Sequence, residues 1–447
     1  MVKVITYGTF DVLHYGHIRL LERVRELGDY MIVGVTSDDY DKTRGKINNQ
    51  QSLMERIAAV EATGIADMVI VEEYEGQKIA DIQKYHVDIF TVGSDWTGYF
   101  DYLKEYCKVI YLPRTAGISS SEIRRSQRSL SLGMTGESSF LNKVATECKV
   151  VNGINLRGVC AQDTELLSCE INELPLVTRD FDELLAHVDA VYIRSQPAVH
   201  YEQIKAALKA GKHVLCEAPR TLSVNQWDEL TALAEESNVV LMDAIKTAYA
   251  TAYERLLLLL RAGKIGDIVS VDATCTSMAH SPGSGENQKE YEWDNIYEWG
   301  PTALLPVLQI LGIGYREVRM AVRHTDKEKK HDSFTKMEFV YPKAVASIKT
   351  GNGVKSEGEL VVSGTKGYLY VPAPWWKTDY FETRYENPEM NRRYFYQLEG
   401  EGIRYELVAF AKAAFSGERF YNIAPETSRA ISRLMEKFVC RMDVVDI

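Results

Sequence analysis

The stretch YGTFDVLHYGHIRLLERV, residues 7–24, decides the fold at the start of this 447-residue chain. It continues an apolar, β-rich run over residues 2–7, and its second half carries apolar residues at helical spacing. His14 and His17 therefore fall at a strand-to-helix turn, together with Gly16. In a parallel α/β sheet this edge binds ligands, and the N–H groups at a helix N-terminus favour phosphate. Gly16 would let a ligand approach the backbone closely.

Strand and helix patterns alternate outward from this turn. Apolar runs such as DYMIVGV and DMVIVEE are separated by amphipathic stretches such as LMERIAAVEAT, QKIADIQKYH and FDYLKEYC. The alternation predicts an α/β fold built on a doubly wound parallel sheet of about five strands. Because the polar, basic stretch RRSQRS follows the last strand, we expect a first domain over residues 1–127.

The alternation restarts after this basic stretch. Runs such as LSLGMTGES, INLRGVC, AVYIRSQP and HVLCEAP are separated by helical patterns and predict a second, Rossmann-like α/β domain over residues 129–243. Farther on, longer alternating strands such as IVSVDATCTSM precede the helical stretch EGIRYELVAFAKAAF. These predict an α+β domain over residues 244–447 with a mostly antiparallel sheet.

Composition and charge narrow the possible partners. The net charge of -11 and the pI near 5.5 argue against a nucleic-acid partner or an anionic membrane surface. The seven cysteines are scattered without a CxxC pair, which favours reduced thiols over a disulfide frame or a zinc site, and we expect no metal site. No leader-like segment opens the chain, and apolar runs such as LLLLL at 256–260 are too short to span a bilayer. We therefore expect a cytoplasmic protein without membrane insertion.

Three stretches of the first domain carry a family resemblance. VITYGTFDVLHYGHIRLLER, GSDWTGYFDYLK and VIYLPRTAGISSSEI resemble the glycerol-3-phosphate cytidylyltransferases, with the paired motifs HxGH and RTxGISSS in order. The resemblance implies that a small polyol phosphate attacks the α-phosphorus of CTP, with Mg²⁺ present, and that a CDP-alditol and pyrophosphate are formed. It also implies a homodimer and a product used for cell-surface polymers such as teichoic acid or capsule. A non-catalytic CTP sensor is the competing class, and the intact motifs argue against it.

Phosphoryl transfer needs positioning and neutralisation of developing negative charge. His14 and His17 would hold the α- and β-phosphate oxygens, and Arg114 would point at the β- and γ-phosphates from a second helix start. Lys46 could reach the leaving pyrophosphate. The residues expected to line the nucleotide are Thr9, Phe10, Gly16, Thr115, Gly117, Ile118, Ser119, Ser120 and Ser121.

The acceptor would lie close by. By position in the family pattern, Arg44 and Lys78 would contact its phosphate, and Asp67, Asp95 and Trp96 would organise the pocket. Solvated loop charges are the alternative interpretation of the two cations. The resemblance implies that the acceptor is glycerol 3-phosphate or a close relative. The family often carries lysine where Arg44 stands, and because a planar guanidinium differs from a point charge, this departure leaves the identity of the acceptor open.

Residues 129–440 resemble a second family, the Gfo/Idh/MocA oxidoreductases. The resemblance rests on AVYIRSQPAVHYEQIKAALKAGKHVLCEAP, RAGKIGDIVSVDAT and VSGTKGYLYV, and it implies a Rossmann-like domain that binds NAD(P). The family's GxGxxG turn keeps only Gly136, and Glu217 is followed by Ala218 where the family has its lysine. The other departures are Ser138 and Leu141 in the turn, Ala161 at the ribose position, and Glu298 and Thr302 in place of the usual Asp and His.

Two interpretations of this half stay open. It is a reductase whose chemistry has moved to Lys246, Tyr297 or Glu298, and which makes a polyol phosphate from a keto- or aldose phosphate with NAD(P)H. Alternatively it is a degenerate scaffold that binds a sugar or nucleotide or builds the oligomer. The altered positions lead us to expect the scaffold, because alcohol chemistry needs a proton acceptor near the hydride centre.

Overall fold

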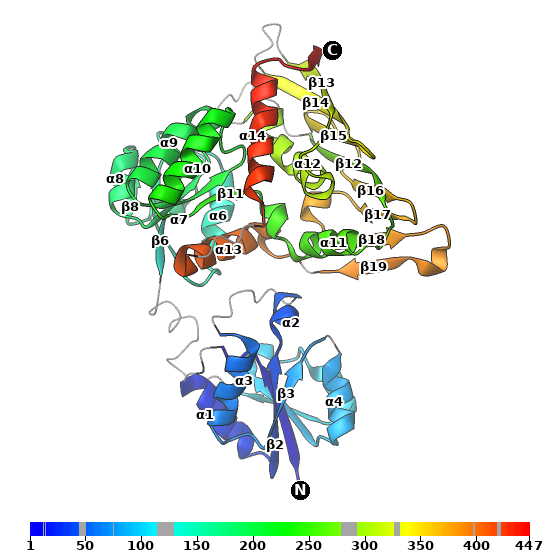
Figure 1. The fold of residues 1–447 in the computed structure, drawn as a ribbon. Helices are drawn as coiled ribbons and strands as arrows, with labels where there is room; N and C mark the ends of the chain where they lie inside the picture. The colour runs from blue at the N-terminus through cyan, green and yellow to red at the C-terminus, as the bar shows by residue number, and fades with distance from the viewer. Residues whose placement is uncertain are drawn as a thin grey trace. The chain divides into compact units, whose positions relative to one another are not determined.

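The computed structural model describes residues 1–11, 13, 15–43, 51–74, 76–113, 129–278, 293–325, 331–396, 398–417 and 422–447. The chain divides into two compact units, Met1–Ser129 and Leu130–Ile447. Figure 1 draws the first unit in blue to cyan and the second from cyan to red.

A parallel five-stranded sheet forms the centre of the first unit, as predicted, with the strand order β3-β2-β1-β4-β5. The order runs outward from β1 in both directions. Sheets of this kind bind ligands at the carboxyl ends of the strands, beside the point where the order reverses. The strands are β1 (Lys3–Gly8), β2 (Tyr30–Thr36), β3 (Met68–Glu72), β4 (Ile89–Gly93) and β5 (Lys108–Leu112).

Helices cover both faces of this sheet (Figure 1). Leu21 and Val60 pack in one apolar core, and Ile82 packs in a second core on the other face. The stretch FDYLKEYC, expected to be an α-helix, forms only a 3-10 turn, because the ring of Phe100 is drawn into the second core against Phe90. The helical elements are α1 (Tyr15–Arg25), α2 (Asp38–Thr43), α3 (Leu53–Ala62), α4 (Gln77–Tyr85), η1 (Ser94–Trp96) and η2 (Asp101–Glu105).

A second parallel sheet, with the strand order β11-β10-β9-β6-β7-β8, opens the second unit. The order of its strands reverses between β6 and β9, so the turns that follow these two strands meet at the switch point of the sheet. Its strands are β6 (Leu130–Thr135), β7 (Ile154–Cys160), β8 (Leu176–Thr178), β9 (Ala190–Ile193), β10 (His213–Glu217) and β11 (Leu241–Ala244). Its helices are α6 (Phe140–Cys148), α7 (Cys169–Asn172), α8 (Phe181–Ala186), α9 (Pro197–Lys209) and α10 (Val224–Glu236).

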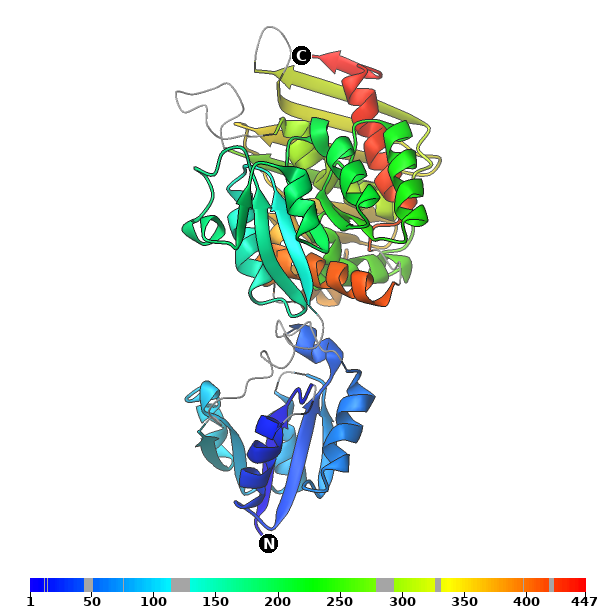
Figure 2. The same cartoon turned by 90° about the vertical axis from the view of Figure 1, so that its left-hand side faces the viewer.

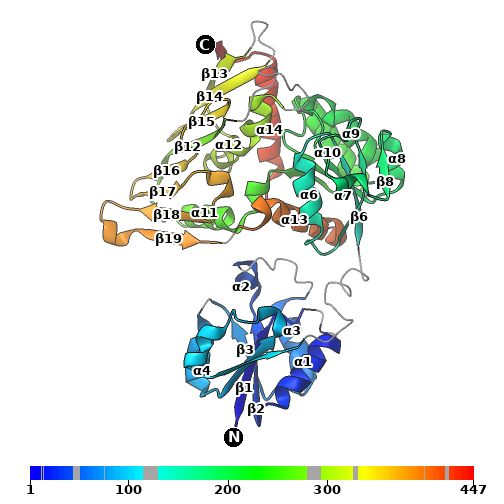
Figure 3. The same ribbon diagram turned by 180° about the vertical axis from the view of Figure 1, so that it is seen from behind.

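The rest of the second unit carries a sheet with the order β19-β18-β17-β16-β12-β15-β14-β13-β20. Only the pairs β12–β15 and β13–β20 among these described strands are parallel, so the predicted mostly antiparallel sheet is confirmed. Figure 3 shows the strands in succession, and Figure 2 shows red β20 beside the yellow strands. The strands are β12 (Ile268–Ser277), β13 (Glu317–His324), β14 (Asp332–Val340), β15 (Val345–Asn352), β16 (Leu360–Gly364), β17 (Tyr368–Val371), β18 (Tyr380–Arg384), β19 (Arg392–Phe395) and β20 (Val444–Asp446).

The last two long helices return to the Rossmann-like part and hold the unit together. Helix α13 packs on α6, and α14 packs on both α10 and α12. Arg404 donates to Glu147 at 2.8 Å, and Trp227 Nε1 donates to Ser428 Oγ at 2.8 Å. The helical elements of this part are η3 (Lys246–Tyr249), α11 (Thr251–Arg261), α12 (Asn295–Leu311), η4 (Trp375–Lys377), η5 (Pro388–Met390), η6 (Gly400–Gly402), α13 (Ile403–Ser416) and α14 (Pro425–Val439).

Within the described ranges, no helix combines the length and the hydrophobicity that crossing a bilayer requires.

Candidate functional site

The turn between β1 and α1 lies at the carboxyl edge of the first sheet. Thr9 Oγ1 donates to Asp41 Oδ1 at 3.1 Å, and Phe10 is buried with a left-handed backbone φ of 52°. The Phe10 ring meets the imidazole of His17 edge to face, with 5.6 Å between centroids. Packing against this ring holds His17 in the first turn of α1, beside Gly16, where N–H groups are available for phosphate.

Arg56, which sequence analysis missed, organises the same turn from α3. Its side chain is 0% exposed, and its Nη1 donates to the carbonyl oxygens of Thr9 at 2.7 Å and Thr36 at 2.8 Å. It also pairs with Asp38. One guanidinium therefore joins the carboxyl ends of β1 and β2. The sequence held a signal for this residue. Arg56 stands four residues before Val60, so the two side chains lie on the same, buried face of the helix.

Two of the expected acceptor-site residues also lie toward this edge. Lys78 is buried, pairs with Glu72, and lies 4.7 Å from the centroid of the Tyr7 ring. It is therefore not a solvated loop charge. Trp96 in η1, directly after β4, packs against Tyr99 with 5.4 Å between ring centroids. A cation, a carboxylate and aromatic rings are thus available near the ends of β3 and β4.

Asp67 does not join these residues. It stands just before β3, accepts from the Met31 backbone N–H at 2.7 Å and pairs with Arg25. This is the amino-terminal edge of the sheet, opposite the turn that holds His17. We therefore correct its expected role from organising the pocket to fixing the start of β2.

The remaining predicted residues of the first unit lie outside the described residues. They are His14, Arg44, Lys46, Arg114, Thr115, Gly117, Ile118, Ser119, Ser120 and Ser121, together with the side chain of Asp95. Among the described residues, no group of three or more His, Cys, Asp or Glu side chains is arranged to hold a metal ion.

A pocket of about 280 Å³ occupies the switch point of the second unit. Gly136, with a φ of 133°, closes β6 there, and a Cβ at this position would lie 2.5 Å from the carbonyl oxygen of Arg194. Glycine is therefore required by packing between the two turns. Around this pocket stand Ser138, Ala161, Gln162, Arg179, Arg194 and Trp293.

Arg194 is the residue of this pocket that sequence analysis missed. It is buried at the end of β9, pairs with Glu298 at 2.6 Å, and stacks 3.6 Å from the centroid of the Trp293 ring. Its Nη1 is buried and has no hydrogen-bond partner among the described residues. The sequence held a signal for this residue, because Arg194 directly follows the apolar run AVYI. A cation that is buried at the end of such a strand needs a partner.

Glu217 and Lys246 stand at the ends of β10 and β11. Glu217 accepts from the hydroxyl of Tyr192, and burial raises the pKa of the Glu217 carboxyl. Lys246 Nζ donates to Glu401 at 3.0 Å, and burial lowers the pKa of the Lys246 ammonium although the Glu401 charge opposes the shift. The ring of Tyr297, the other candidate for the relocated chemistry, packs against Phe438 of α14.

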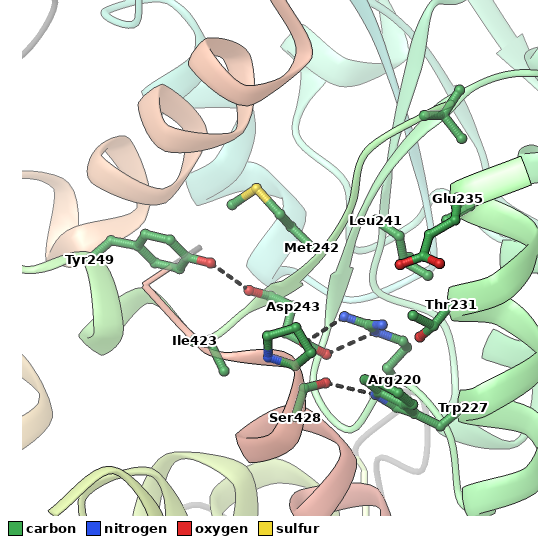
Figure 4. A pocket seen from close by; sticks show the side chains of 13 residues that line it. Arg220, Trp227, Thr231, Glu235, Leu241, Met242, Asp243, Tyr249, Ile423 and Ser428 are labelled. Carbon is green, nitrogen blue, oxygen red and sulfur yellow. Dashed lines mark hydrogen bonds and ion pairs between the residues drawn. The ribbon is translucent and has the colours of Figure 1, made fainter. Parts of the chain in front are cut away.

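A second pocket, of about 150 Å³, is lined by residues of β11, α10 and the start of α14 (Figure 4). Arg220 donates through Nε at 3.1 Å and Nη2 at 2.6 Å to the carboxylate of Asp243. Tyr249 Oη donates to the Asp243 carbonyl oxygen at 3.1 Å. These bonds hold the chain on both sides of Lys246, and we call Arg220, Asp243 and Tyr249 the brace.

Comparison with known proteins assigns a family to each unit. The profile of the Cytidylyltransferase-like family matches residues 5–126, and that of the oxidoreductase family with an NAD-binding Rossmann fold matches residues 132–244. The glycerol-3-phosphate cytidylyltransferase of Bacillus spizizenii is 51% identical over 130 residues, 29% of this chain and 100% of that protein. The enzyme of the same name from Staphylococcus aureus is 47% identical over 125 residues, 28% of this chain and 94% of that protein.

The second unit shares its fold with solved oxidoreductases. A 3-ketoreductase from Actinomadura kijaniata, crystallised with NADP and TDP-benzene, matches 72% of this chain and 99% of its own, with a TM-score of 0.62 and 19% identity. At this identity the likeness shows the fold alone. The chain therefore belongs, through its first unit, to the glycerol-3-phosphate cytidylyltransferase family and is a nucleotidyltransferase, and its second unit carries a Gfo/Idh/MocA Rossmann domain.

Proposed function

We propose that the first unit transfers CMP from CTP to glycerol 3-phosphate or a closely related polyol phosphate. An acceptor phosphate oxygen forms a bond to the α-phosphorus, and the bond to the leaving pyrophosphate breaks. The observation that carries this proposal is the 51% identity across the full length of a relative with this named activity. The turn held by Phe10 and Arg56 supports it, because it presents His17 at a helix start.

The residues have separate tasks in this proposal. His14 and His17 donate to the phosphate oxygens, Arg114 and Lys46 neutralise the charge that develops on the pyrophosphate, and Mg²⁺ enters with CTP. Near the end of β3, Lys78 supplies a cation for the acceptor's phosphate, and Glu72 supplies a carboxylate that accepts from hydroxyl groups. A cation beside a carboxylate suits an acceptor that carries both a phosphate and hydroxyl groups.

The test is pyrophosphate release by the full chain with CTP and a panel of polyol phosphates. We expect release with glycerol 3-phosphate or a near relative, and no comparable release with UTP or without acceptor. His17→Ala should lower kcat by about a hundredfold or more, because a donor to the charged phosphates is lost. His86→Ala is the matched control, since His86 is an exposed residue at the end of α4. Equal activities of the two variants would remove His17 from the site.

Further parts of the proposal rest on the family alone. We infer that the active species is a cytoplasmic homodimer and that its CDP-alditol serves a cell-surface polymer such as teichoic acid or capsule. Equilibrium sedimentation of the full chain tests the dimer.

The second unit's family implies a nicotinamide dinucleotide, and the switch-point pocket offers groups that fit one. Nη1 of Arg194, which has no hydrogen-bond partner in the part of the chain that the structure describes, would face its phosphates, together with the side chain of Arg179 and the N-terminus of α6. When bound, the group would exchange a hydride with a substrate carbon. The replacement of the family's lysine by Ala218 supports the scaffold interpretation, whereas the placement of Lys246 favours a reductase.

A further inference from the structure

Three lysines converge on one carboxylate in the second unit, that of Glu401. Its oxygens lie 2.9 Å from Nζ of Lys143, 3.0 Å from Nζ of Lys246 and 2.9 Å from Nζ of Lys377. Burial opposes ionisation of Glu401, yet hydrogen bonds from Lys377 and Lys143 and the charge of Lys246 lower its pKa to about 2. A single negative charge cannot balance three positive ones, so this lysine cluster is a positive surface suited to an anion.

The backbone that presents Glu401 is unusual. Gly400, Glu401 and Gly402 all have positive φ, at 56°, 53° and 91°. Positive φ is uncommon for a residue other than glycine, and such conformations gather at functional sites. Gly402 also lets the start of α13 approach Lys246, because a Cβ there would lie 3.3 Å from the Lys246 carbonyl oxygen.

Lys246 differs from the other two lysines in burial and in neighbours. Its side chain is 17% exposed, against 50% for Lys143 and 34% for Lys377. Glu217 of β10 and Glu406 of α13 act on it electrostatically. Glu406 is fully buried, and neither of its carboxylate oxygens has a hydrogen-bond partner among the described residues. Burial raises the pKa of both carboxyls, so they can hold a proton beside the lysine.

One aromatic ring lies near both this group and a residue that lines the switch-point pocket. The Phe140 ring, at the start of α6, lies 5.4 Å from Lys246 Nζ and 5.6 Å from the guanidinium carbon of Arg194, which lines the pocket. The brace holds the segment that carries Lys246. The lysine is therefore rigidly placed between a pocket that fits a dinucleotide and a cluster that fits an anion.

We propose that Lys246 transfers the proton in a second, oxidoreductase site of this chain, whose substrate is a phosphorylated polyol or the matching keto compound. Lys143 and Lys377 bind its phosphate, while Glu401 keeps the three ammonium groups together.

The step balances in both directions. In oxidation, the neutral amine of Lys246 would take the proton of the substrate hydroxyl, and NAD(P)⁺, when bound, would accept a hydride from the same carbon, so that a ketone is left. In reduction, the Lys246 ammonium would donate the proton to the carbonyl oxygen, and NAD(P)H, when bound, would supply the hydride to the carbon. Lys246 then recovers a proton from Glu217 or from water.

The test compares lysine variants of the full chain. Reduction of NAD⁺ and NADP⁺ is followed at 340 nm with phosphorylated three- to six-carbon polyols and with the same polyols lacking phosphate. We expect turnover of a phosphorylated compound, a fall in kcat of about a hundredfold or more for Lys246→Ala, and partial recovery with added ethylamine. Lys377→Ala and Lys143→Ala are the comparison variants, because each removes from the same carboxylate one lysine that binds the phosphate, and they should raise KM more than they lower kcat.

Two readouts do not depend on turnover. NADPH fluorescence should report binding by both the native chain and Lys246→Ala. NMR titration of ¹³C-methylated lysines should give Lys246 a pKa below those of the exposed lysines, although Glu401 opposes this shift and Lys377, Lys143, Glu217 and Glu406 also face the group.

Three results would overturn the proposal: no turnover of any member of the panel, equal losses of kcat in all three lysine variants, or an ordinary pKa for Lys246. Lys246→Met, which keeps an apolar chain of similar length, replaces Lys246→Ala if the latter unfolds. CMP transfer measured on the same samples reports separately on the first unit.

Discussion

A single guanidinium, that of Arg56, connects the turn after β1 with the end of β2. It is held between two backbone carbonyls and lies 3.9 Å from the buried carboxylate of Asp41. Removing one member of such a buried arrangement leaves the others unsatisfied, which costs more than the arrangement contributes as a whole. At the scale of residues, the turn after β1 therefore depends on a side chain that is itself fully buried.

Replacement of Arg56 tests this dependence. We expect Arg56→Leu to lower the free energy of unfolding of the first unit by about 3–5 kcal/mol and to reduce CMP transfer. Arg19→Leu, which removes only an exposed pair with Glu22, should leave the free energy of unfolding nearly unchanged, because solvent screens such a pair. Urea unfolding measures both, and equal midpoints would contradict the role given to Arg56.

The ionisation of Glu401 makes the stability of the second unit depend on pH, and the direction of this dependence follows from the lowered pKa of the carboxyl. Its pKa is about 2 in the folded chain and 4.5 in the unfolded reference. The folded value is depressed, so its stabilising contribution is present above about pH 4.5 and is lost as the pH falls toward 2. Glu401→Gln should therefore lose stability at pH 7 and show a shallower loss between pH 5 and pH 2. Parallel curves for the two proteins would show that the lysines do not stabilise the folded carboxylate.

At the scale of elements, β10 and β11 are positioned by the brace. Arg220 and Asp243 are both buried, and Tyr249 ties η3 back to the end of β11. These contacts explain how Lys246, which lies on the short 3-10 helix η3, is held in a defined position. The order of the strands also brings Glu217 and Lys246 to the same sheet edge, because parallel neighbours end together.

Loss of the brace has a predictable cost. Arg220→Met leaves Asp243 charged and unpaired, and we expect the unfolding free energy to fall by about 3–5 kcal/mol. The double change Arg220→Met with Asp243→Leu should recover much of that loss, since no buried charge remains. Chemical unfolding of the two variants beside the native chain makes the comparison, and a double variant as unstable as the single one would rule out this explanation.

At the scale of the whole molecule, the two units have separate cores. The first sheet is complete within Met1–Ser129, whereas α13 and α14 bind the two sheets of Leu130–Ile447 into one body. The first unit should therefore fold without the second.

A fragment that ends at Gln127 tests this independence. It contains the full five-stranded sheet and both phosphate-binding motifs, so we expect it to unfold cooperatively and to transfer CMP. Circular dichroism and pyrophosphate release provide the measurements. A folded, dimeric but inactive fragment would mean that the second unit contributes to the transferase site.

The sequence by itself determined most of the elements and the parallel and antiparallel sheets, and it predicts the residues of the first site that form short motifs. Periodicity and motif spacing are local properties, so they can be read along the chain. The position of Arg56 on an otherwise apolar helix face was a signal, but the carbonyl oxygens that this side chain meets could not be predicted, nor could the place of Asp67, which depends on the sheet edge it meets.

Only the tertiary structure brought the charged groups of the second unit together. Glu401 and Lys246 are 155 residues apart, and Arg194 and Glu298 are 104 residues apart, yet each pair is in contact. No local pattern encodes such pairs, because they form only when α13 packs on α6 and η3 and when Glu298 of α12 meets Arg194 at the end of β9. The sequence shows that a lysine is missing at Ala218, and packing supplies another at nearly the same edge from the end of a neighbouring strand.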